Sequence, residues 1–421
     1  MIPVNPHLRS SFFALVLALA AIPSLPAASI LRSGDLVAVC GDSITEQKLY
    51  SLYIEQYLLL CQPADNLMAM QFGWGGERAS GFLARVDNDV LTFKPTVVTT
   101  CYGMNDGNYA PVNPGTLDGY RKAMTDSVRK LKAGGVRAII VGTPGIVDTV
   151  AFRRPGADAI TYNATLSALA GVAREVAQSE NVLFADVYTP MMASMLKART
   201  VLGEGYKIAP DGVHPFPGAH LAMAYAFLKA MDVNGDIGTL TVDYSGNRAV
   251  GSSGHRVISY AQGVLRVEST RYPYCFIGKP DGNDTLAMSA FLPFNEELNR
   301  YRLVVQNAPA RTRITWGVAS KEFTAAQLAV GIKLAAEFPE NPFSEPFAAA
   351  TKVMQDQQVF ETNGIKNMLN PLARWSLVIP EGVGHIAALR DLIIAKSEAV
   401  RASTRAAIRP VAHEIKIEAV Q

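Results

Sequence analysis

Between residues 34 and 231 the chain alternates short apolar runs with longer stretches whose apolar positions recur at helical spacing. Continuous apolar runs are typical of buried parallel strands, and they predict strands at 35–40, 66–72, 96–102, 136–142 and 182–187. Helical spacing predicts helices near 48–61, 79–91, 115–133, 160–179, 188–199 and 217–231. Strands joined by crossover helices predict a flavodoxin-like, three-layer α/β/α fold with a five-stranded parallel sheet over residues 30–236.

The texture of the chain changes after about residue 235. Residues 238–320 are rich in small and polar residues, and short pieces such as 263–267 and 301–305 predict antiparallel strands joined by loops. Helical spacing returns at 324–337, at about 344–359 and at 386–408. We therefore expect residues 237–421 to form an accessory α+β region that packs against the first domain.

The first 29 residues have the layout of a secretory signal peptide. His7 and Arg9 form a weakly basic start, residues 12–22 are apolar, and Ala28 and Ser29 belong to a run of small residues suited to cleavage. The apolar stretch is shorter than the ~20 residues that span a bilayer, and an uncleaved anchor is the alternative. The mature protein is expected to be secreted or periplasmic, without stable membrane insertion.

The charge balance and the cysteine pattern bear on whether the protein binds nucleic acid or a metal ion. The chain has 39 Lys and Arg against 37 Asp and Glu, a formal net charge of +2, which gives no reason to expect a nucleic acid partner. Its four cysteines, Cys40, Cys61, Cys101 and Cys275, form no C-x-x-C pattern and indicate no metal site. Cys40 and Cys101 lie inside apolar strand runs, where cysteine usually packs as a small hydrophobe, and their disulfide status stays open.

Residues that can carry chemistry follow the predicted strands in four blocks. Residues 41–43 end the first strand, 73–78 follow the second, 102–107 follow the third, and 211–214 lie beyond the fifth. In α/β sheets, ligand chemistry gathers at the carboxyl ends of the strands. We therefore expect the four blocks to converge on one crevice.

These blocks contain a serine hydroxyl, a histidine imidazole and an aspartate carboxylate, from Ser43, His214 and Asp211. The Ser43 hydroxyl is a poor nucleophile at neutral pH and needs a base, which His214 can supply with an unperturbed pKa of ~6.5. Asp211 can hold the imidazole in the correct tautomer and stabilise the imidazolium. Singly, Ser43 could be a helix N-cap, and Asp-x-x-His is a common chance spacing. Their joint occurrence, in order and each at the expected place in the sheet, favours nucleophilic catalysis.

An attacked carbonyl would also need hydrogen-bond donors for its developing negative charge. Ser43 N–H, a glycine N–H and the Asn105 side-chain amide could supply them, each worth roughly 3–4 kcal/mol of transition-state stabilisation. Asp42 and Asp106 are expected to cap or brace their loops. Other neighbours keep two interpretations: Trp74 either walls the substrate pocket or packs, and Glu77 and Arg78 either bind a polar substrate or lie on a solvated face. His220 is expected to be structural.

Together the four blocks resemble those of the SGNH (GDSL-type) hydrolase superfamily of serine esterases and lipases, over roughly residues 34–231. The matching stretches are Gly41-Asp42-Ser43-Ile44, Gly75-Gly76-Glu77, Gly103-Met104-Asn105-Asp106 and Asp211-Gly212-Val213-His214-Pro215. The resemblance implies that Ser43, Asp211 and His214 are catalytic, that Ser43, Gly76 and Asn105 form the oxyanion hole, and that no metal or organic cofactor is needed. Gly75 stays the alternative to Gly76. One departure is that Gly76-Glu77-Arg78 replaces the family's more frequent Gly-Asp-Thr/Ser continuation.

The resemblance further implies an exported serine esterase. The residues flanking the blocks are small and polar and offer no apolar lid, so the expected substrate is an O-acetylated carbohydrate or another small ester. A lipid-directed esterase or lysophospholipase is the alternative, and a non-catalytic carbohydrate-binding or scaffold protein is the second. The C-terminal half also resembles the tail of exported bacterial SGNH proteins, in which a strand pair like 301–305 and 313–316 precedes a helix like 328–335.

Overall fold

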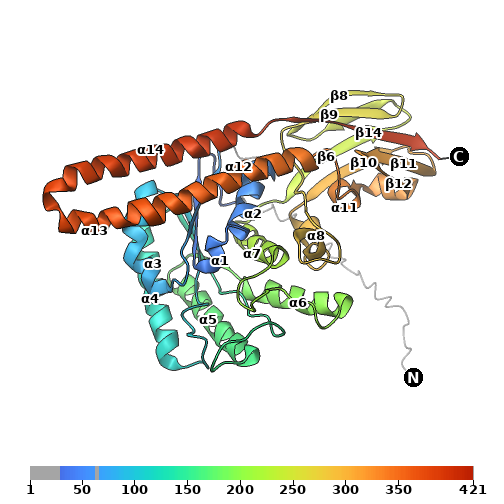
Figure 1. Cartoon of the computed structure of the whole chain (residues 1–421). Helices are drawn as coiled ribbons and strands as arrows, with labels where there is room; N and C mark the ends of the chain where they lie inside the picture. The colour runs from blue at the N-terminus through green and yellow to red at the C-terminus, as the bar shows by residue number, and fades with distance from the viewer. Residues whose placement is uncertain (1–28, 62–65, 421) are drawn as a thin grey trace, which may run out of the picture.

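The first sheet of the protein has five parallel strands in the order β2-β1-β3-β4-β5 (Figure 1). The computed structural model describes residues 29–61 and 66–420, so residues 1–28 of the expected signal peptide lie outside the described residues. The strands are β1 (Leu36–Gly41), β2 (Met68–Gly73), β3 (Val97–Cys101), β4 (Ala138–Gly142) and β5 (Leu183–Ala185). This order and the parallel pairing confirm the flavodoxin-like sheet that the alternating pattern predicts.

Helices cover both faces of this sheet. They are α1 (Ser43–Glu46), α2 (Tyr50–Gln56), α3 (Ala79–Arg85), α4 (Pro114–Ala133), α5 (Ala159–Ser179), α6 (Tyr188–Leu202) and α7 (Pro217–Ala230), with shorter turns η1 (Tyr57–Cys61), η2 (Val86–Val90) and η3 (Leu91–Phe93). Helices α3, α4 and α5 pack side by side, and α2, α7 and α6 form the second group. Met124, Val128 and Leu131 are fully buried on α4, as its helical spacing requires.

Two further sheets follow, and all their pairings but one have the expected antiparallel pattern. One has the order β13-β10-β6-β7 and the other β12-β11-β14-β9-β8. Their strands are β6 (Asp236–Asp243), β7 (Arg248–Gly251), β8 (His255–Ala261), β9 (Val264–Ser269), β10 (Arg300–Gln306), β11 (Arg311–Trp316), β12 (Ala319–Thr324), β13 (Ile332–Lys333) and β14 (Val411–Ala419). β10 pairs with β6 in parallel. The segments 301–305 and 313–316 lie in different sheets, so the expected strand pair does not form.

The C-terminal helices are α8 (Thr285–Met288), α9 (Phe294–Glu297), α10 (Ala325–Val330), α11 (Leu334–Glu337), α12 (Ser344–Asn363), α13 (Asn370–Val378) and α14 (Val383–Ala407), with η4 (Gly364–Leu369) and η5 (Pro380–Gly382) between the last of them. The helix expected at 324–337 is interrupted: Gly331 takes φ +101°, and the chain turns there into β13, which pairs with β10 and separates α10 from α11. α12 packs against α2 and β2, and α14 returns along α12 (Figure 1).

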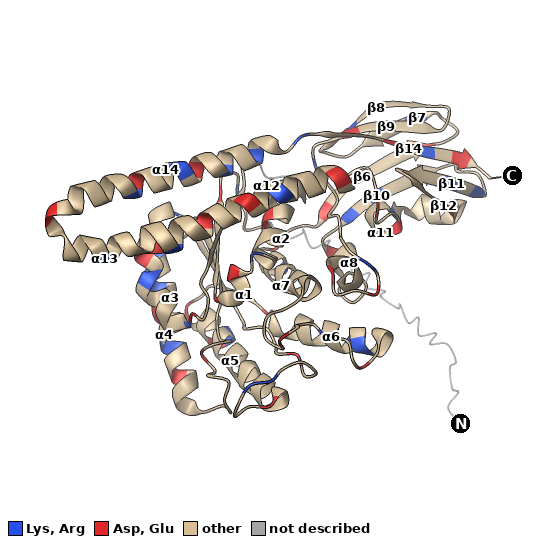
Figure 2. Ribbon diagram, in the orientation of Figure 1, with Lys and Arg blue, Asp and Glu red and all other residues tan. Residues whose placement is uncertain are grey.

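Acidic and basic residues are interspersed along α12 and α14 (Figure 2). Within residues 29–61 and 66–420 none of the helices combines the length and the apolar character that crossing a bilayer requires.

Candidate active site

Ser43 lies at the carboxyl edge of the parallel sheet, where β1 ends and α1 begins. Asp42 is the N-cap of α1, and its Oδ1 accepts the N–H of Ile44 at 2.9 Å. A Cβ on Gly41 would meet Thr45 Oγ1 at 2.0 Å and the Cys101 carbonyl oxygen at 2.9 Å, so only glycine fits this turn. Burial raises the pKa of Asp42 to about 7, against the hydrogen bond from Ile44. The expectation that Asp42 caps its loop is confirmed.

Three polar side chains form a continuous hydrogen-bonded chain at this edge. His214 Nε2 lies 2.9 Å from Ser43 Oγ, and His214 Nδ1 lies 2.7 Å from Asp211 Oδ2. Asp211 Oδ1 also accepts the backbone N–H groups of Val213 and His214, at 2.9 and 2.8 Å. Burial alone would raise the pKa of Asp211, but these bonds from His214 and Val213 outweigh it and hold the pKa at about 2. The carboxylate therefore stays charged beside the imidazole over the whole physiological range.

A buried ion pair holds the loop that carries Asp211 and His214. Asp148 is fully buried, pairs with Arg199 at 3.2 Å, and accepts the N–H of Ile208 at 2.7 Å. The Asp148 N–H in turn donates to the Gly212 carbonyl at 2.9 Å. Gly212 has φ +83°, and a Cβ there would lie 2.2 Å from the Phe152 Cα, so this position also requires glycine. The sequence offers no signal for this ion pair, because Asp148 and Arg199 are 51 positions apart.

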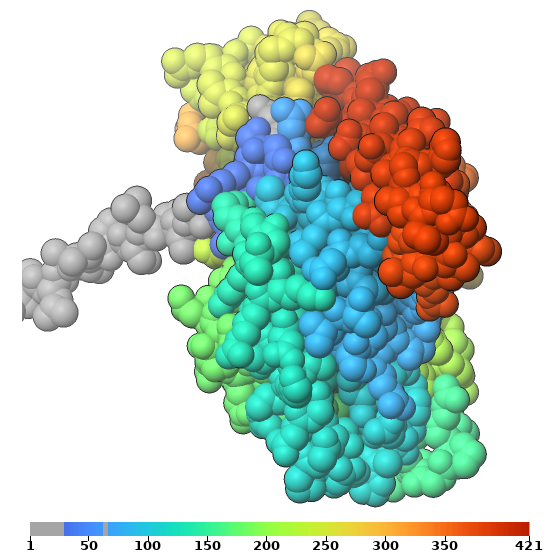
Figure 3. Space-filling view, turned by 90° about the vertical axis from the view of Figure 1, so that its left-hand side faces the viewer, coloured from blue at the N-terminus to red at the C-terminus, as the bar shows by residue number. Residues whose placement is uncertain are grey.

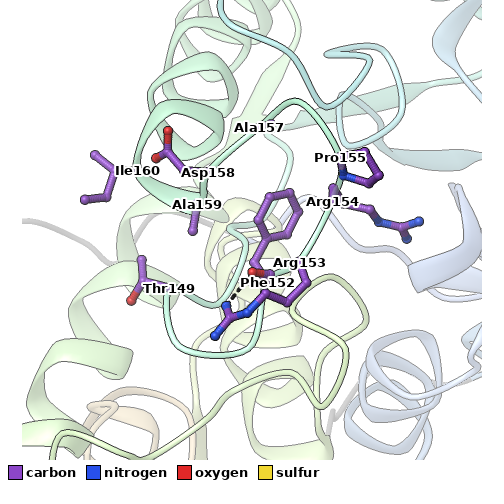
Figure 4. Close-up of a pocket in the computed structure, with 9 residues that line it drawn as sticks. All are labelled: Thr149, Phe152, Arg153, Arg154, Pro155, Ala157, Asp158, Ala159 and Ile160. Carbon is purple, nitrogen blue, oxygen red and sulfur yellow. Dashed lines mark hydrogen bonds between the residues drawn. The ribbon is translucent and has the colours of Figure 1, made fainter.

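The segment between β4 and α5 forms an open pocket beside this loop (Figure 4). The pocket has a volume of about 710 Å³, and its lining includes Thr149, Phe152, Arg153, Arg154 and Asp158. The centres of the Phe152 and Tyr109 rings lie 6.3 Å apart. The Arg154 guanidinium lies 4.9 Å from the centre of the Tyr109 ring. The lining next to the Asp211 loop thus mixes charged and polar side chains with apolar ones, and Phe152 itself is buried.

The loop after β2 distinguishes the two candidate glycines. The N–H of Gly75 donates to Glu46 Oε2 at 2.5 Å. Gly76 has φ +71°, a Cβ built there would meet no atom within 4 Å, and its N–H has no acceptor among the described residues. An oxyanion donor must be unoccupied before substrate arrives, so the geometry favours Gly76 over Gly75.

Asn105 faces the same loop from the end of β3. Its Nδ2 donates to the Glu77 carbonyl at 3.0 Å, which uses one of the two amide hydrogens, and Tyr109 donates to its Oδ1 at 3.3 Å. Asp106 accepts the N–H groups of Ala79 and Gly103, both at 3.0 Å. Asp106 thus ties two loops together, as expected of a bracing residue. Burial raises the pKa of Asp106 to about 6, opposed by these backbone hydrogen bonds.

Neither expectation for Glu77 is correct. Glu77 is buried and accepts two hydrogen bonds from Arg85, each 2.7 Å long, and a third from the Tyr102 hydroxyl at 2.8 Å. Arg78 is exposed and donates to Asn108. Two cations approach the Trp74 ring, with Arg85 Cζ at 5.1 Å and Lys366 Nζ at 4.9 Å from its centre. The Glu77 side chain therefore points into the protein interior, where it anchors the loop after β2, and does not face a substrate.

The remaining candidates have structural roles. His220 is fully buried, accepts the Tyr50 N–H at 3.3 Å and contacts Gln47 at 3.1 Å; burial lowers its pKa to about 3. The four cysteines are buried and free of disulfides. In the described part of the chain, no three His, Cys, Asp or Glu side chains gather where they could hold a metal ion.

Comparison with known proteins identifies the class. Residues 39–220 match the model of the GDSL-like Lipase/Acylhydrolase family. The acetylxylan esterase of Geobacillus stearothermophilus is 24% identical over 217 residues, which cover 48% of this chain and 92% of that protein. The chain is a carboxylic ester hydrolase. It belongs to the SGNH (GDSL-type) hydrolase superfamily. The four sequence blocks and the family match both indicate this superfamily.

The fold of the whole chain also has a counterpart. BT4096, a gut microbial diltiazem-metabolizing enzyme, superimposes with a TM-score of 0.73 at 20% identity, over 93% of this chain and 99% of that one. The likeness therefore extends beyond the parallel sheet into the C-terminal sheets and helices.

Proposed function

We propose that the protein is an exported serine esterase in which Ser43 is the nucleophile, His214 the general base and acid, and Asp211 the residue that orients His214. The single observation that carries this proposal is the continuous chain from Ser43 Oγ through His214 to Asp211, at 2.9 and 2.7 Å. A proton on Nδ1 is held by the ionised Asp211, which leaves the Nε2 lone pair facing the serine hydroxyl.

The reaction runs in two halves. Ser43 Oγ attacks the ester carbonyl carbon while its proton passes to His214 Nε2, and the carbonyl oxygen becomes an oxyanion. His214 then gives this proton to the departing alkoxide oxygen, which leaves an acyl group on Ser43. Water, deprotonated by His214, attacks the acyl carbon, and the carboxylic acid departs as Ser43 regains its proton.

Three donors would stabilise the oxyanion: Ser43 N–H, Gly76 N–H and the second hydrogen of Asn105 Nδ2. Gly76 is supported by its open N–H and by the engagement of the neighbouring Gly75 N–H with Glu46. Preorganised donors of this kind cost no reorganisation when charge develops.

An O-acetylated carbohydrate is the proposed substrate. Support comes from the acetylxylan esterase similarity and from the open pocket beside the Asp211 loop, where Phe152 lies among Arg153, Arg154 and Asp158. The arginine and aspartate side chains of this lining can hydrogen-bond the hydroxyl groups of a sugar, and its apolar residues can pack against the sugar ring.

Acetate release from a panel of acetylated xylo-oligosaccharides and other acetylated glycans tests this function. Wild-type protein should release acetate and Ser43→Ala should not. Aryl esters of increasing chain length supply the second arm, and we expect acetyl to be preferred over octanoyl and palmitoyl. A preference for long chains would replace the carbohydrate proposal with a lipid-directed esterase. If the protein hydrolyses none of these esters, the interpretation as a non-catalytic carbohydrate-binding or scaffold protein would replace the esterase.

A further inference from the structure

Glu46 connects the helix that begins at Ser43 to the loop of the oxyanion glycine and to the C-terminal region. It is the last residue of α1, so it lies one turn from Ser43. Its Oε2 accepts the Gly75 N–H at 2.5 Å, and its Oε1 accepts a hydrogen bond from Lys366 Nζ at 2.6 Å. Lys366 lies in η4, 320 positions along the chain and outside the segment that matches the family.

Lys366 also contacts the residue before Gly75. Its Nζ lies 4.9 Å from the centre of the Trp74 ring, and Arg85 faces the same ring at 5.1 Å. The Trp74 N–H donates to the Gly41 carbonyl at 3.0 Å, and the Glu77 N–H donates back to the Trp74 carbonyl at 3.1 Å. The backbone is therefore held on both sides of Gly76, whose own N–H is left open.

The position of η4 is itself fixed on the edge strand of the sheet. Glu361, at the end of α12, accepts the Gln71 N–H of β2 at 3.0 Å, and Thr362 donates to the Gln71 side chain at 3.0 Å. β2 runs on from there into Trp74. In Figure 3 the orange and red C-terminal helices lie directly against the blue segments of the first domain. β2 and α12 are thus hydrogen-bonded to each other a few residues before Trp74 on one side and a few residues before Lys366 on the other.

We propose that Lys366 is a positioning residue for ester hydrolysis: through Glu46 it holds the Gly75 N–H and so fixes the Trp74–Gly75 peptide, which sets the direction of the next peptide and of its Gly76 N–H toward the oxyanion. The inference rests on the proposed function and gives the C-terminal region a part in it. An ordinary exposed ion pair contributes little. This pair is only about a quarter exposed on both sides, with side-chain fractions of 25% for Lys366 and 24% for Glu46, and it ends on a backbone N–H of the site.

The test is the kinetics of Lys366→Met, which keeps the aliphatic stem and removes the cation. We expect kcat on p-nitrophenyl acetate to fall about 10-fold or more while KM changes less than about 2-fold, because a donor misplaced by a fraction of an ångström weakens transition-state binding and not substrate binding. Lys366→Arg should recover most of kcat. The matched control is Lys352→Met on α12, where Lys352 is 68% exposed and pairs only with Asp356 within its own helix. It should keep wild-type kinetics.

Glu46→Gln tests the same link from within the first domain. Because both changes act through one contact, the double variant Glu46→Gln/Lys366→Met should lose no more kcat than the worse single variant. Equal kcat in Lys366→Met and Lys352→Met would overturn the inference, as would losses that multiply in the double variant. A fall confined to the unfolding midpoint, with kcat intact, would make Lys366 merely structural. If the wild-type protein hydrolyses no ester and its Ser43 is unreactive, the proposed function fails, and this inference fails with it.

Discussion

Replacing Arg85 by methionine should destabilise the protein strongly, because it removes the partner of a buried carboxylate. The Arg85 and Glu77 side chains are only 6% and 5% exposed, and two hydrogen bonds of 2.7 Å join them. Arg85 also donates to the Phe72 carbonyl at 2.7 Å. In Arg85→Met the Glu77 carboxylate would keep only the Tyr102 hydroxyl, and breaking a buried pair in this way costs about 3–5 kcal/mol. That is a large part of the 5–15 kcal/mol by which folded proteins are typically stable.

Urea unfolding followed by circular dichroism measures this loss as a lower midpoint. Arg121→Met is the matched control, since Arg121 is 40% exposed and its pairs with Asp118 and Glu175 lie at the surface. It should cost less than about 1 kcal/mol. Glu77→Met/Arg85→Met removes both members of this pair and leaves only the buried Asp89, 3.6 Å from Arg85, without the arginine, so it should be more stable than Arg85→Met alone. A loss below 1 kcal/mol in Arg85→Met, equal to the control, would refute the claim that an unpaired buried charge is what destabilises.

Two further predictions concern the residues around Ser43. Asn105→Ala should lower kcat about 100- to 1,000-fold with little change in KM, as expected for the loss of one oxyanion donor, and steady-state kinetics on p-nitrophenyl acetate would detect it; an unchanged kcat would remove Asn105 from the site. For Asp42, burial raises the folded-state pKa to about 7 against an unfolded value of ~3.9, so its contribution to stability is complete below about pH 4 and is lost as the pH rises through 7. Asp42→Asn keeps the cap without titrating, so urea unfolding between pH 4 and 8 should show a shallower decline than wild type, whereas an identical slope would contradict the argument.

The first domain is predictable because each of its strands and helices has its own local pattern of apolar positions. Continuous apolar runs identify β1 to β5, Ser43 follows the end of β1, and Asp211 and His214 lie in the loop between α6 and α7. Gly76 and Gly75 could not be separated from the sequence. The difference between them depends on Glu46, a contact across 29 positions, which no local pattern carries.

The C-terminal half depends on long-range pairing, and the sequence conveys less of it. β14 alternates buried and exposed residues, with Val411, His413, Ile415 and Ile417 facing inward, but its place between β9 and β11 depends on strands 100 or more positions earlier. The helix break at Gly331 shows the same limit. Apolar spacing continues across this glycine, and only the pairing of β13 with β10 explains why the helix stops.

Glu77 was misread for a related reason. A charged residue in a glycine-rich loop is usually solvated or functional, but Arg85, eight positions later on α3, turns back beneath the loop and buries it. A buried ion pair between two elements has no periodic signature. Lys366, 320 positions from its partner Glu46, is the extreme case.

The most direct test of the account is labelling with a fluorophosphonate, which reacts with a serine only when a neighbouring base activates it. We predict one adduct per chain, located at Ser43 by peptide mass spectrometry, absent in Ser43→Ala and greatly slowed in His214→Ala. Adducts at another residue, or none in folded wild-type protein, would contradict the claim that the contact between Ser43 and His214 makes a nucleophile.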